Sequence, residues 1–182
     1  MINFATVGTN FVVDWFIKAT SKCDSLKYKG TYSRNIEKAK EFGEKYGSTL
    51  FFDDLDELAK CDSIDAVYIA SPTSFHFEQA LKMIENKKHV FVEKPMASNS
   101  REVEILIEKA NENNVVLIEG MRSVYDDGFK AVEKAIEKIA PVRRASFKLC
   151  QYSSRYNKFK NGIVENAFNP KFSNGAIMDI GV

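Results

Sequence analysis

Apolar residues follow two alternating periods along the first two-thirds of the chain. Short runs rich in β-branched and aromatic residues, typical of buried strands, lie at residues 2–7, 26–32, 48–52, 66–70, 90–92 and 115–118. Between these runs, apolar residues recur at the three- and four-residue spacing of a helix face, at residues 11–19, 36–46, 53–59, 77–84 and 100–113. The alternation predicts an α/β fold with a doubly wound parallel sheet and right-handed crossovers.

The helical segments also predict which side chains face the core. In the first of them, the inward stripe is expected to be Phe11, Val12, Trp15, Phe16 and Ala19. In the helix at 100–113, the inward stripe is expected to be Val103, Leu106, Ile107 and Ala110. Each stripe should pack against the sheet.

The pattern changes after residue 122. A helix is expected at 128–139, followed by an alternating, half-exposed strand of the antiparallel type at 142–150. The polar and aromatic stretch at 151–169 has loop character, and 174–182 looks like a helix start built from small residues.

A lone antiparallel strand cannot form a sheet, because both of its edges and one apolar face stay unsatisfied. We therefore expect residues 1–122 to form one domain of the Rossmann type. Residues 123–182 are expected to be the beginning of a second, α+β domain that is incomplete in this chain.

Composition narrows the range of partners. The 182 residues are 45% hydrophobic and 28% charged, with a net charge of +1, which gives no electrostatic case for binding nucleic acid or an anionic membrane. No apolar run is long enough to span a bilayer. Three scattered cysteines and two histidines make no zinc set, so we expect reduced thiols, no metal and a cytoplasmic location without a signal peptide.

The turn after the first strand is a candidate phosphate site. Gly8, Thr9 and Asn10 lead into the helical segment that begins with Phe11 and Val12. Only the first glycine of a G-x-G-x-x-G fingerprint is kept, but Asn can cap a helix and tolerates left-handed backbone. Free N–H groups at this helix start would suit a pyrophosphate. Alternatively, the glycine is an ordinary feature of a strand-to-helix turn.

The end of the second strand bears on the choice of cofactor. A dinucleotide fold places the adenosine ribose there, and NAD enzymes usually hold its 2′-hydroxyl with Asp or Glu. This chain has Ser33 and Arg34 instead, and an arginine would pair with a 2′-phosphate. The sequence thus favours NADP(H), with NAD(H) possible as the second choice. Alternatively, Arg34 binds nothing and Asn35 is a plain helix cap.

A third turn follows the strand at 66–70. It carries Ala70, Ser71, Pro72 and Thr73, and His76 stands in the first turn of the next helix. At the carboxyl end of a parallel strand, these residues would line the cofactor cleft. Alternatively, Ser74 caps the helix and His76 is a surface histidine.

The strand at 90–92 ends abruptly on Glu93, Lys94 and Pro95. A buried strand that stops on an acid, an amine and a ring with fixed φ lies where open α/β sheets bind ligands. We interpret Lys94 as the working amine of an active site. Alternatively, both charges are ordinary surface groups, and Lys94 only pairs with Glu93.

Taken together, these motifs resemble the Gfo/Idh/MocA family, which includes glucose–fructose oxidoreductase and inositol dehydrogenase. The resemblance rests on Gly8 to Asn10, Tyr32 to Arg34, Ser71 to Thr73 with His76, Glu93 to Met96, and the late stretch Gly175 to Gly181. It extends over the whole chain but over only part of the family's usual length. Members continue with a large, mostly antiparallel sheet that walls the substrate site and usually carries the oligomer interface.

The resemblance implies a role for each matching residue. Gly8 to Val12 would hold the pyrophosphate, Ser33 and Arg34 would meet the ribose, and Ala70 to Thr73 with His76 would line the cleft. Glu93 and Lys94 would lie by the nicotinamide, where Lys94 would bind the substrate hydroxyl and take part in proton transfer. Asp179 would face Lys94, and could alternatively be a helix cap. Where the family often has His or Tyr two residues after the late glycine, this chain has ended.

The implied activity is hydride transfer between a nicotinamide cofactor and a hydroxyl group of a sugar, polyol, cyclitol or related compound. The alternative is a dinucleotide-binding regulator or sensor without turnover, or an inactive fragment. The resemblance also implies a homo-oligomer formed through the second-domain sheet of a complete protein. We expect the exposed strand around Phe147 to make this chain prone to associate.

Overall fold

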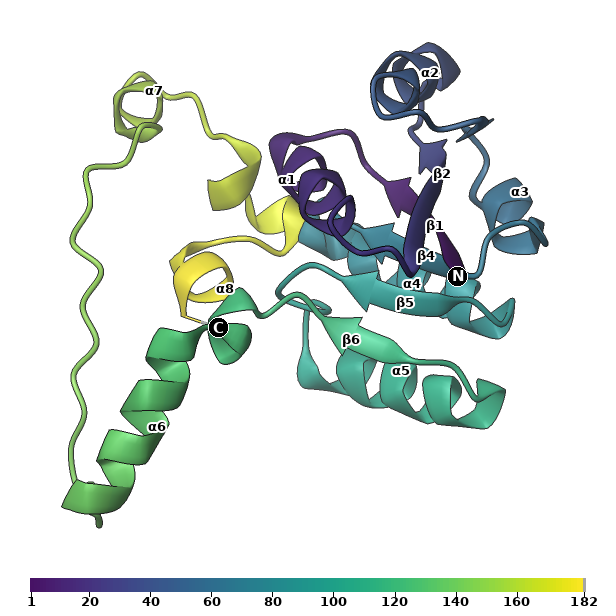
Figure 1. Ribbon diagram of the computed structural model, residues 1–182. Helices are drawn as coiled ribbons and strands as arrows, with labels where there is room; N and C mark the ends of the chain where they lie inside the picture. Colours follow the sequence, from purple (N-terminus) through teal and green to yellow (C-terminus); the bar gives the residue numbers. More distant parts are fainter. Residues whose placement is uncertain (182) are drawn as a thin grey trace.

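A computed structural model describes residues 1–181, and its centre is one parallel sheet (Figure 1). The strands are β1 (Ile2–Val7), β2 (Leu26–Tyr32), β3 (Leu50–Phe52), β4 (Ala66–Ile69), β5 (His89–Val92) and β6 (Leu117–Glu119). They lie side by side in the order β3-β2-β1-β4-β5-β6, and every neighbouring pair is parallel. This confirms the doubly wound Rossmann sheet. Its strand order reverses between β1 and β4, where such sheets open a crevice.

Helices connect the strands and cover the sheet unequally. They are α1 (Phe11–Thr20), α2 (Ile36–Glu44), α3 (Leu55–Lys60), α4 (His76–Glu85) and α5 (Ser100–Asn113). Side chains of α3, α4 and α5 join the larger core cluster, whereas α1 and α2 pack in a smaller cluster with Tyr68 and Phe91. Because alternate strand residues point to opposite faces, the two clusters lie on opposite sides of the sheet.

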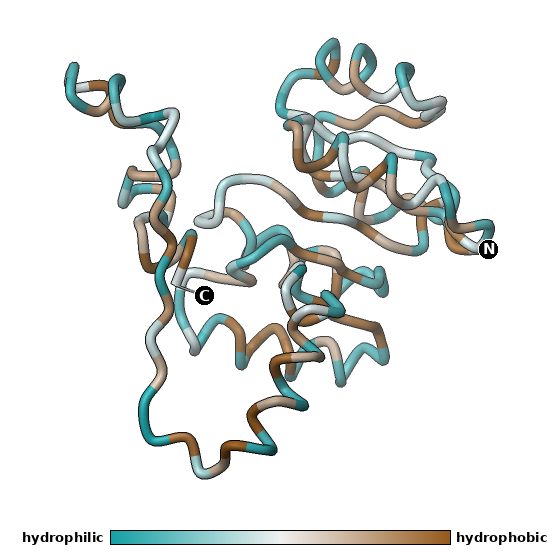
Figure 2. The backbone as a smooth tube through the Cα atoms, turned by 60° about the vertical axis from the view of Figure 1, so that its left-hand side comes forward, coloured by the Kyte–Doolittle hydropathy of each residue, from teal (hydrophilic) through white to brown (hydrophobic). Residues whose placement is uncertain are grey.

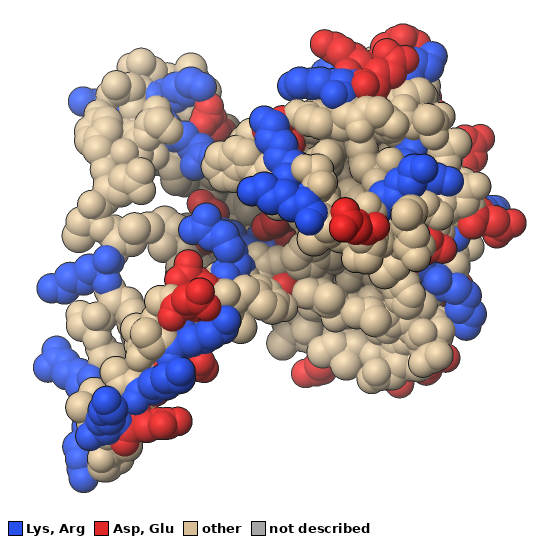
Figure 3. Space-filling view, viewed as in Figure 1, with Lys and Arg blue, Asp and Glu red and all other residues tan. Residues whose placement is uncertain are grey.

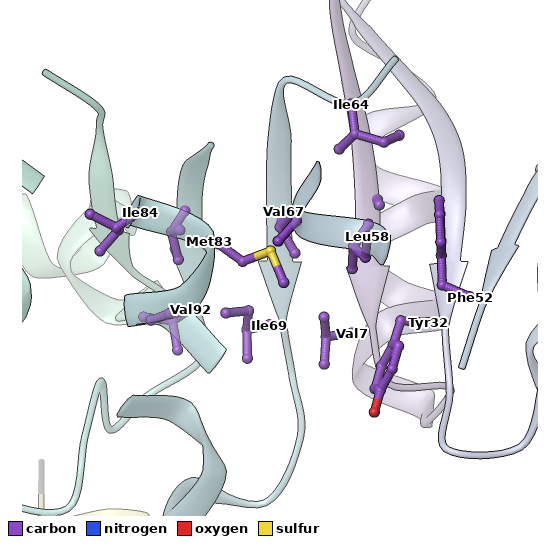
Figure 4. Close-up of a cluster of buried hydrophobic side chains, with 14 of the residues drawn as sticks. Val7, Tyr32, Phe52, Leu58, Ile64, Val67, Ile69, Met83, Ile84 and Val92 are labelled. Carbon is purple, nitrogen blue, oxygen red and sulfur yellow. The ribbon is translucent and has the colours of Figure 1, made fainter. Parts of the chain in front are cut away.

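The larger cluster is the main source of apolar burial. Figure 4 shows side chains from the sheet, including Val7, Val67, Ile69 and Val92, packed against Met83 and Ile84 of α4 and against Leu58 of α3. Most of these side chains are fully buried. This packing holds the strands in place, and therefore also positions the turns that follow their carboxyl ends.

The chain beyond β6 makes a wide loop away from the sheet and then returns (Figures 1 and 2). It contains the short helix η2 (Arg122–Tyr125), then α6 (Asp127–Ile139), α7 (Tyr156–Lys160), η3 (Asn166–Phe168), η4 (Pro170–Phe172) and α8 (Ala176–Ile180). The return is anchored where Ser98 Oγ and Ser173 Oγ lie 2.7 Å apart and where the rings of Phe75 and Phe172 approach to 6.3 Å. The end of the chain thus lies at the carboxyl edge of the sheet.

Two predictions about apolar patterns are partly wrong. In α1, Phe16 packs on the sheet as expected. The buried residues are Val13, Ile17 and Thr20, whereas Phe11, Trp15 and Ala19 are exposed. In α5, Leu106 and Ala110 are buried as expected, but Ile107 is half exposed.

The predicted strand at 142–150 does not form either. The segment is extended but pairs with no other strand in the described residues, because this part of the chain offers no partner for its edges. Phe147 within it is almost fully exposed. Other differences are small: β3 starts two residues later than predicted, and β6 covers Leu117–Glu119 instead of 115–118.

Candidate active site at the carboxyl edge of the sheet

The turn between β1 and α1 approaches the turn after β4 closely. Gly8 has φ of +114°, and a Cβ built there would lie 3.1 Å from the carbonyl oxygen of Ala70. A side chain is therefore excluded both by the backbone conformation and by the neighbouring strand. The turn between β1 and α1 therefore requires glycine at position 8.

Asn10 connects the same two turns through both ends of its amide. Its Oδ1 accepts hydrogen bonds from the backbone N–H groups of Val12 (3.0 Å) and Val13 (3.2 Å), and its Nδ2 donates to Ala70 O at 2.7 Å. Asn10 is the cap of α1, as its residue type suggested. The N–H group of Val12 is therefore used by this cap, whereas, within the described residues, the N–H groups of Thr9 and Phe11 have no protein acceptor.

Arg34 stands exposed after β2, beside a cavity of about 550 Å³. The cavity is lined by Gly8, Thr9, Asn10, Ser33, Arg34, Ser71 and Pro72, together with Leu55, Phe75 and Lys82, which the sequence did not indicate. Asn35 caps α2 by accepting from Lys38 N at 3.0 Å. Burial raises the pKa of Tyr32, the last residue of β2, and the charge of Arg34 opposes this shift. Asp54 and Asp53 also raise the pKa of Tyr32, so these two acids of the β3–α3 turn lie close to the end of β2.

His76 is a buried bridge between two turns of the site, and not a surface histidine. Its Nδ1 lies 2.9 Å from Pro95 O, and its Nε2 lies 2.8 Å from Ser71 O. Both neighbours are acceptors, and a neutral imidazole has one N–H, so it can donate to only one of them. Burial lowers the pKa of His76, and the hydrogen bonds to these two carbonyls oppose that shift. His76 therefore connects the turn after β4 to the residue that follows Lys94.

The hydroxyls of the β4 turn have protein partners. Ser71 Oγ donates to Gln79 Oε1 at 2.6 Å, and Thr73 Oγ1 donates to Asn174 Oδ1 at 3.1 Å. Ser74 makes no cap hydrogen bond, so the alternative that it caps the helix is wrong. The contact of Thr73 with Asn174 joins this turn to the segment that leads into α8.

Glu93 and Lys94 leave β5 in different directions. Tyr68 on β4 donates to Glu93 Oε1 at 2.6 Å. Lys94 Nζ lies 3.0 Å from Asp179 Oδ1 and also donates to the backbone carbonyl of Asp179. The alternative that Lys94 only pairs with Glu93 is therefore wrong. The predicted pair of Lys94 and Asp179 meets although 85 residues separate the two in sequence.

A cavity of about 610 Å³ adjoins this pair. Its walls include Glu93, Lys94 and Asp179, together with residues that the sequence did not indicate, namely Trp15, Phe16, Tyr68, Gly120, Arg122 and Tyr125. Tyr68 could have been found from the two-residue period of β4, because it points to the opposite face from Val67 and Ile69. Trp15 could not, because its exposure results from a helix face that is left uncovered.

Two further observations limit the chemistry. Within residues 1–181 no group of three or more His, Cys, Asp and Glu side chains is arranged to hold a metal ion. Over the same residues, no helix combines the length and the apolar composition needed to cross a membrane.

Comparison with known proteins agrees with this geometry. Residues 2–121 match the family model described as an oxidoreductase family with an NAD-binding Rossmann fold, Gfo/Idh/MocA. The chain is 46% identical over 182 residues to scyllo-inositol 2-dehydrogenase (NADP(+)) IolU of Bacillus subtilis, and 42% identical over 181 residues to the uncharacterized oxidoreductase YgjR of Escherichia coli. The two alignments cover all of this chain but only 56% and 55% of the two relatives.

A solved structure shows the same fold. The 3-ketoreductase KijD10 from Actinomadura kijaniata, crystallised with NADP and TDP-benzene, superposes with a TM-score of 0.70 at 24% identity. The match covers 75% of this chain and 42% of that one. The sheet order and the cleft at its reversal define a Rossmann protein of the dinucleotide-binding class. More specifically, the chain belongs to the Gfo/Idh/MocA family of oxidoreductases.

The residues at the cleft fit an NAD(P) cofactor. The side-chain-free cradle at Gly8 and the N–H groups of Thr9 and Phe11 at the start of α1 are the features that a pyrophosphate requires. The adjoining cavity continues from this cradle to Ser33 and Arg34 at the end of β2.

Proposed function

We propose that this chain is the cofactor-binding part, with the start of the substrate-binding part, of an NAD(P)-dependent dehydrogenase. The substrate would be a hydroxyl compound such as a sugar, polyol or cyclitol. The observation that carries the proposal is the pair of Lys94 Nζ and Asp179 Oδ1, 3.0 Å apart beside the cavity that Glu93 also lines. An amine and a carboxylate at that place can bind a hydroxyl and move its proton. The name of the Bacillus subtilis relative supports the substrate class.

In this proposal, each side chain has a limited task. A bound nicotinamide supplies the acceptor or donor of the hydride. Lys94 binds the substrate hydroxyl and exchanges its proton, and Asp179 orients the amine. Glu93, which accepts a hydrogen bond from Tyr68, would lie beside the nicotinamide. The backbone at Gly8 and Thr9 would hold the pyrophosphate, and His76 connects the turn after β4 to the turn that carries Lys94.

For the cofactor, we propose a preference for NADP(H). Arg34 is exposed next to the cavity that would hold the adenosine end, so its guanidinium is available to a 2′-phosphate. The relative from Bacillus subtilis is named for NADP(+), which supports this choice. Asp53 and Asp54 lie nearby and would oppose a second phosphate charge, so NAD(H) is the alternative.

A fluorescence titration of this chain with NADPH and NADH tests the cofactor proposal. We expect tight NADPH binding, weak NADH binding, and a selective loss of NADPH affinity in Arg34→Gln. Lys38→Gln is a matched control, because Lys38 is an exposed cation in the first turn of α2. Equal loss in both variants would show a general charge effect and would contradict the role given to Arg34.

Turnover with a panel of polyols and aldoses, using either cofactor, tests the reaction. It is best run on a longer gene product where one exists, because the chain spans about half of its curated relatives. We expect Lys94→Ala to abolish turnover and to leave cofactor affinity unchanged. Tight cofactor binding without turnover on any hydroxyl substrate would favour the second candidate, a dinucleotide-binding sensor.

We also propose that the chain divides near residue 122. The sheet ends at Glu119, and the segment from α6 onward makes its own loop (Figure 1). In a complete protein, residues from about 142 onward would join a second sheet and an oligomer interface, because Phe147 and Leu149 are largely exposed here. Light scattering that shows a monomer over a wide concentration range would contradict self-association of this chain.

A further inference from the structure

The returning chain, residues 155–180, is attached to the carboxyl edge of the sheet. Four contacts hold it there, between Thr73 and Asn174, Ser98 and Ser173, Phe75 and Phe172, and Lys94 and Asp179. Asn174 also donates from Nδ2 to the carbonyl oxygen of Asn166 at 3.0 Å, which connects η3 to the same edge. The returning chain therefore forms a wall opposite the turns that follow the strands.

A cavity of about 230 Å³, the middle cavity, lies between this wall and the sheet. The turns after β1, β4 and β5 form its inner side. The returning chain forms its outer side with Arg155, Ala167, Asn174 and Asp179. A ligand in the middle cavity would therefore contact both the edge of the sheet and the returning chain.

The middle cavity connects the two larger cavities of the candidate site. It shares Asn10 and the turn after β4 with the cavity at Arg34, and it shares Glu93 and Lys94 with the cavity beside that lysine. A dinucleotide with its adenosine at Arg34 and its nicotinamide beside Lys94 has its pyrophosphate between these ends. The start of α1, where a pyrophosphate would bind, lines the middle cavity through Asn10 and Val12.

The charges of the middle cavity single out Arg155. Of the described residues that line this cavity, Lys94 and Arg155 are cations, and Lys94 is paired with Asp179 inside it. Arg155 is paired with Glu165, which is not among the described residues of the lining. The contact is made by Nε, 3.2 Å from Glu165 Oε2. The terminal amino groups of the guanidinium can therefore still donate to a phosphate.

Glu165 also holds Arg155 in place. Its other carboxylate oxygen lies 2.5 Å from Lys158 Nζ, and this hydrogen bond lowers the pKa of Glu165, which keeps the carboxylate charged. Residues 155–165 contain three cations and one acid. Figure 3 shows basic side chains on this part of the chain, at the upper left, some of them on the side toward the body of the molecule. A guanidinium that is already oriented loses less freedom when it binds a phosphate.

We propose that Arg155 binds the pyrophosphate of the dinucleotide, so that the cofactor is held between the start of α1 and the returning chain. The inference rests on the proposed function, because it takes NAD(P)(H) as the ligand. It adds a binding residue outside residues 2–121, the part that matches the NAD-binding family model. It also means that cofactor binding and attachment of the returning chain stabilise each other.

Arg34 and Arg155 have separable tasks in this arrangement. Among the described residues, Arg34 lines the cavity at the end of β2 and Arg155 lines the middle cavity, and neither lines the other's cavity. Arg34 would distinguish NADPH from NADH, whereas Arg155 would bind a group that both cofactors contain. Adenosine 2′-monophosphate separates the two tasks, because it has the 2′-phosphate and lacks the pyrophosphate.

Titrations of this chain with NADPH, NADH and adenosine 2′-monophosphate test the proposal. We expect Arg155→Gln to lose about tenfold in affinity for each of the two cofactors, because a charge-assisted contact is removed. Adenosine 2′-monophosphate, measured by calorimetry, should bind this variant as it binds the wild type. Lys158→Gln is the matched control, because it removes the other cation on Glu165 and leaves the described lining of the middle cavity intact.

Hydrogen exchange measures the contact from the side of the returning chain. We expect saturating NADPH to protect amides at 153–168 in the wild type, and to protect them less in saturated Arg155→Gln. Amides there that NADPH leaves unchanged in the wild type would contradict the proposal.

Two results of the titrations would also overturn it. The first is equal NADPH affinity in Arg155→Gln and Lys158→Gln. The second is a loss confined to NADPH, which would assign Arg155 to the 2′-phosphate. Either result leaves the proposed function standing, whereas a wild-type chain that binds neither cofactor would overturn the proposed function and this inference together.

Discussion

The phenol of Tyr68 donates a 2.6 Å hydrogen bond to Oε1 of Glu93, the residue that precedes Lys94. Tyr68 is 2% exposed, and the ring of Phe16 stacks on it at 3.8 Å. Burial raises the pKa of Tyr68, and the hydrogen bond to Glu93 raises it further, so the phenol stays protonated as a donor. A side chain of α1 and one of β4 together thus hold the acid of the candidate site.

Replacing Tyr68 by Phe removes this donor and keeps the ring. We expect a loss of about 1–2 kcal/mol in the free energy of unfolding, because Glu93 then loses a partner within a half-buried site. Urea unfolding followed by circular dichroism measures it. Tyr28→Phe is the control, because the partners of the Tyr28 hydroxyl are the neutral hydroxyls of Thr31 and Thr6. If Tyr68→Phe costs no more than the control, Glu93 is not held as described.

Substituting Gly8 by Ala tests the phosphate cradle. The change places a Cβ 3.1 Å from Ala70 O at a φ of +114°. Gly47→Ala is the matched control, since Gly47 also has positive φ (+76°) but a Cβ there would meet nothing within 4 Å. We expect both variants to lose about 1 kcal/mol or more of stability from backbone strain.

Only Gly8→Ala should also weaken NADPH binding, because only that Cβ and the accompanying shift of the turn lie in the cleft. Urea unfolding measures the loss of stability, and the fluorescence titration measures the loss of NADPH affinity. Unchanged NADPH affinity in a folded Gly8→Ala protein would contradict the location proposed for the pyrophosphate.

The fold could be predicted in large part because the spacing of apolar residues in strands and in helices reflects which side chains are buried. Strands covered on both faces, such as β4, are apolar at successive positions, and α4 has a single buried stripe. The inward face of α1 was mispredicted because the helix has apolar residues on two sides. One side packs on the sheet, and the other side, with Trp15, borders the cavity beside Lys94.

The candidate site was only partly predictable for a related reason. Glu93 and Lys94 follow a recognisable strand end, but the partner that each one chooses is decided by packing across the sheet. Tyr68 and Gly120 surround Glu93 from neighbouring strands, and a Cβ on Gly120 would lie 3.1 Å from Glu93 Oε1. His76 shows the same limit: its residue type suggests a ligand or a surface group, whereas burial makes it a bridge between two carbonyls.

The buried His76 should make the fold sensitive to acid. Its pKa is lowered in the folded state mainly by burial, although Glu93 and Glu119 act in the opposite direction. The unfolded state therefore takes up a proton first, at its ordinary pKa of 6.5. Stability from the neutral imidazole is complete above that pH and is lost as the pH falls from there through the folded pKa.

Thermal unfolding between pH 7.5 and pH 5.5 measures this effect. We expect His76→Gln to have a lower melting temperature at pH 7.5 but a smaller further decrease on acidification than the wild type. His89→Gln removes the other histidine, whose Nδ1 accepts from Val116 N, and should keep the wild-type decrease. If His89→Gln flattens the pH dependence and His76→Gln does not, the assignment is wrong.

The ion pair of Lys94 with Asp179 should contribute little to the free energy of unfolding, as expected if its role is in the candidate site and not in holding the fold together. The two side chains are 31% and 43% exposed, so water screens the pair even at 3.0 Å. We expect Asp179→Asn to change the free energy of unfolding by less than about 1 kcal/mol. The control is Asp127→Asn, which removes the exposed pair with Lys130 on α6. Urea unfolding compares the two. A loss well above 1 kcal/mol for Asp179→Asn alone would show that the pair anchors the end of the chain to the sheet, which would favour a structural role over a catalytic one.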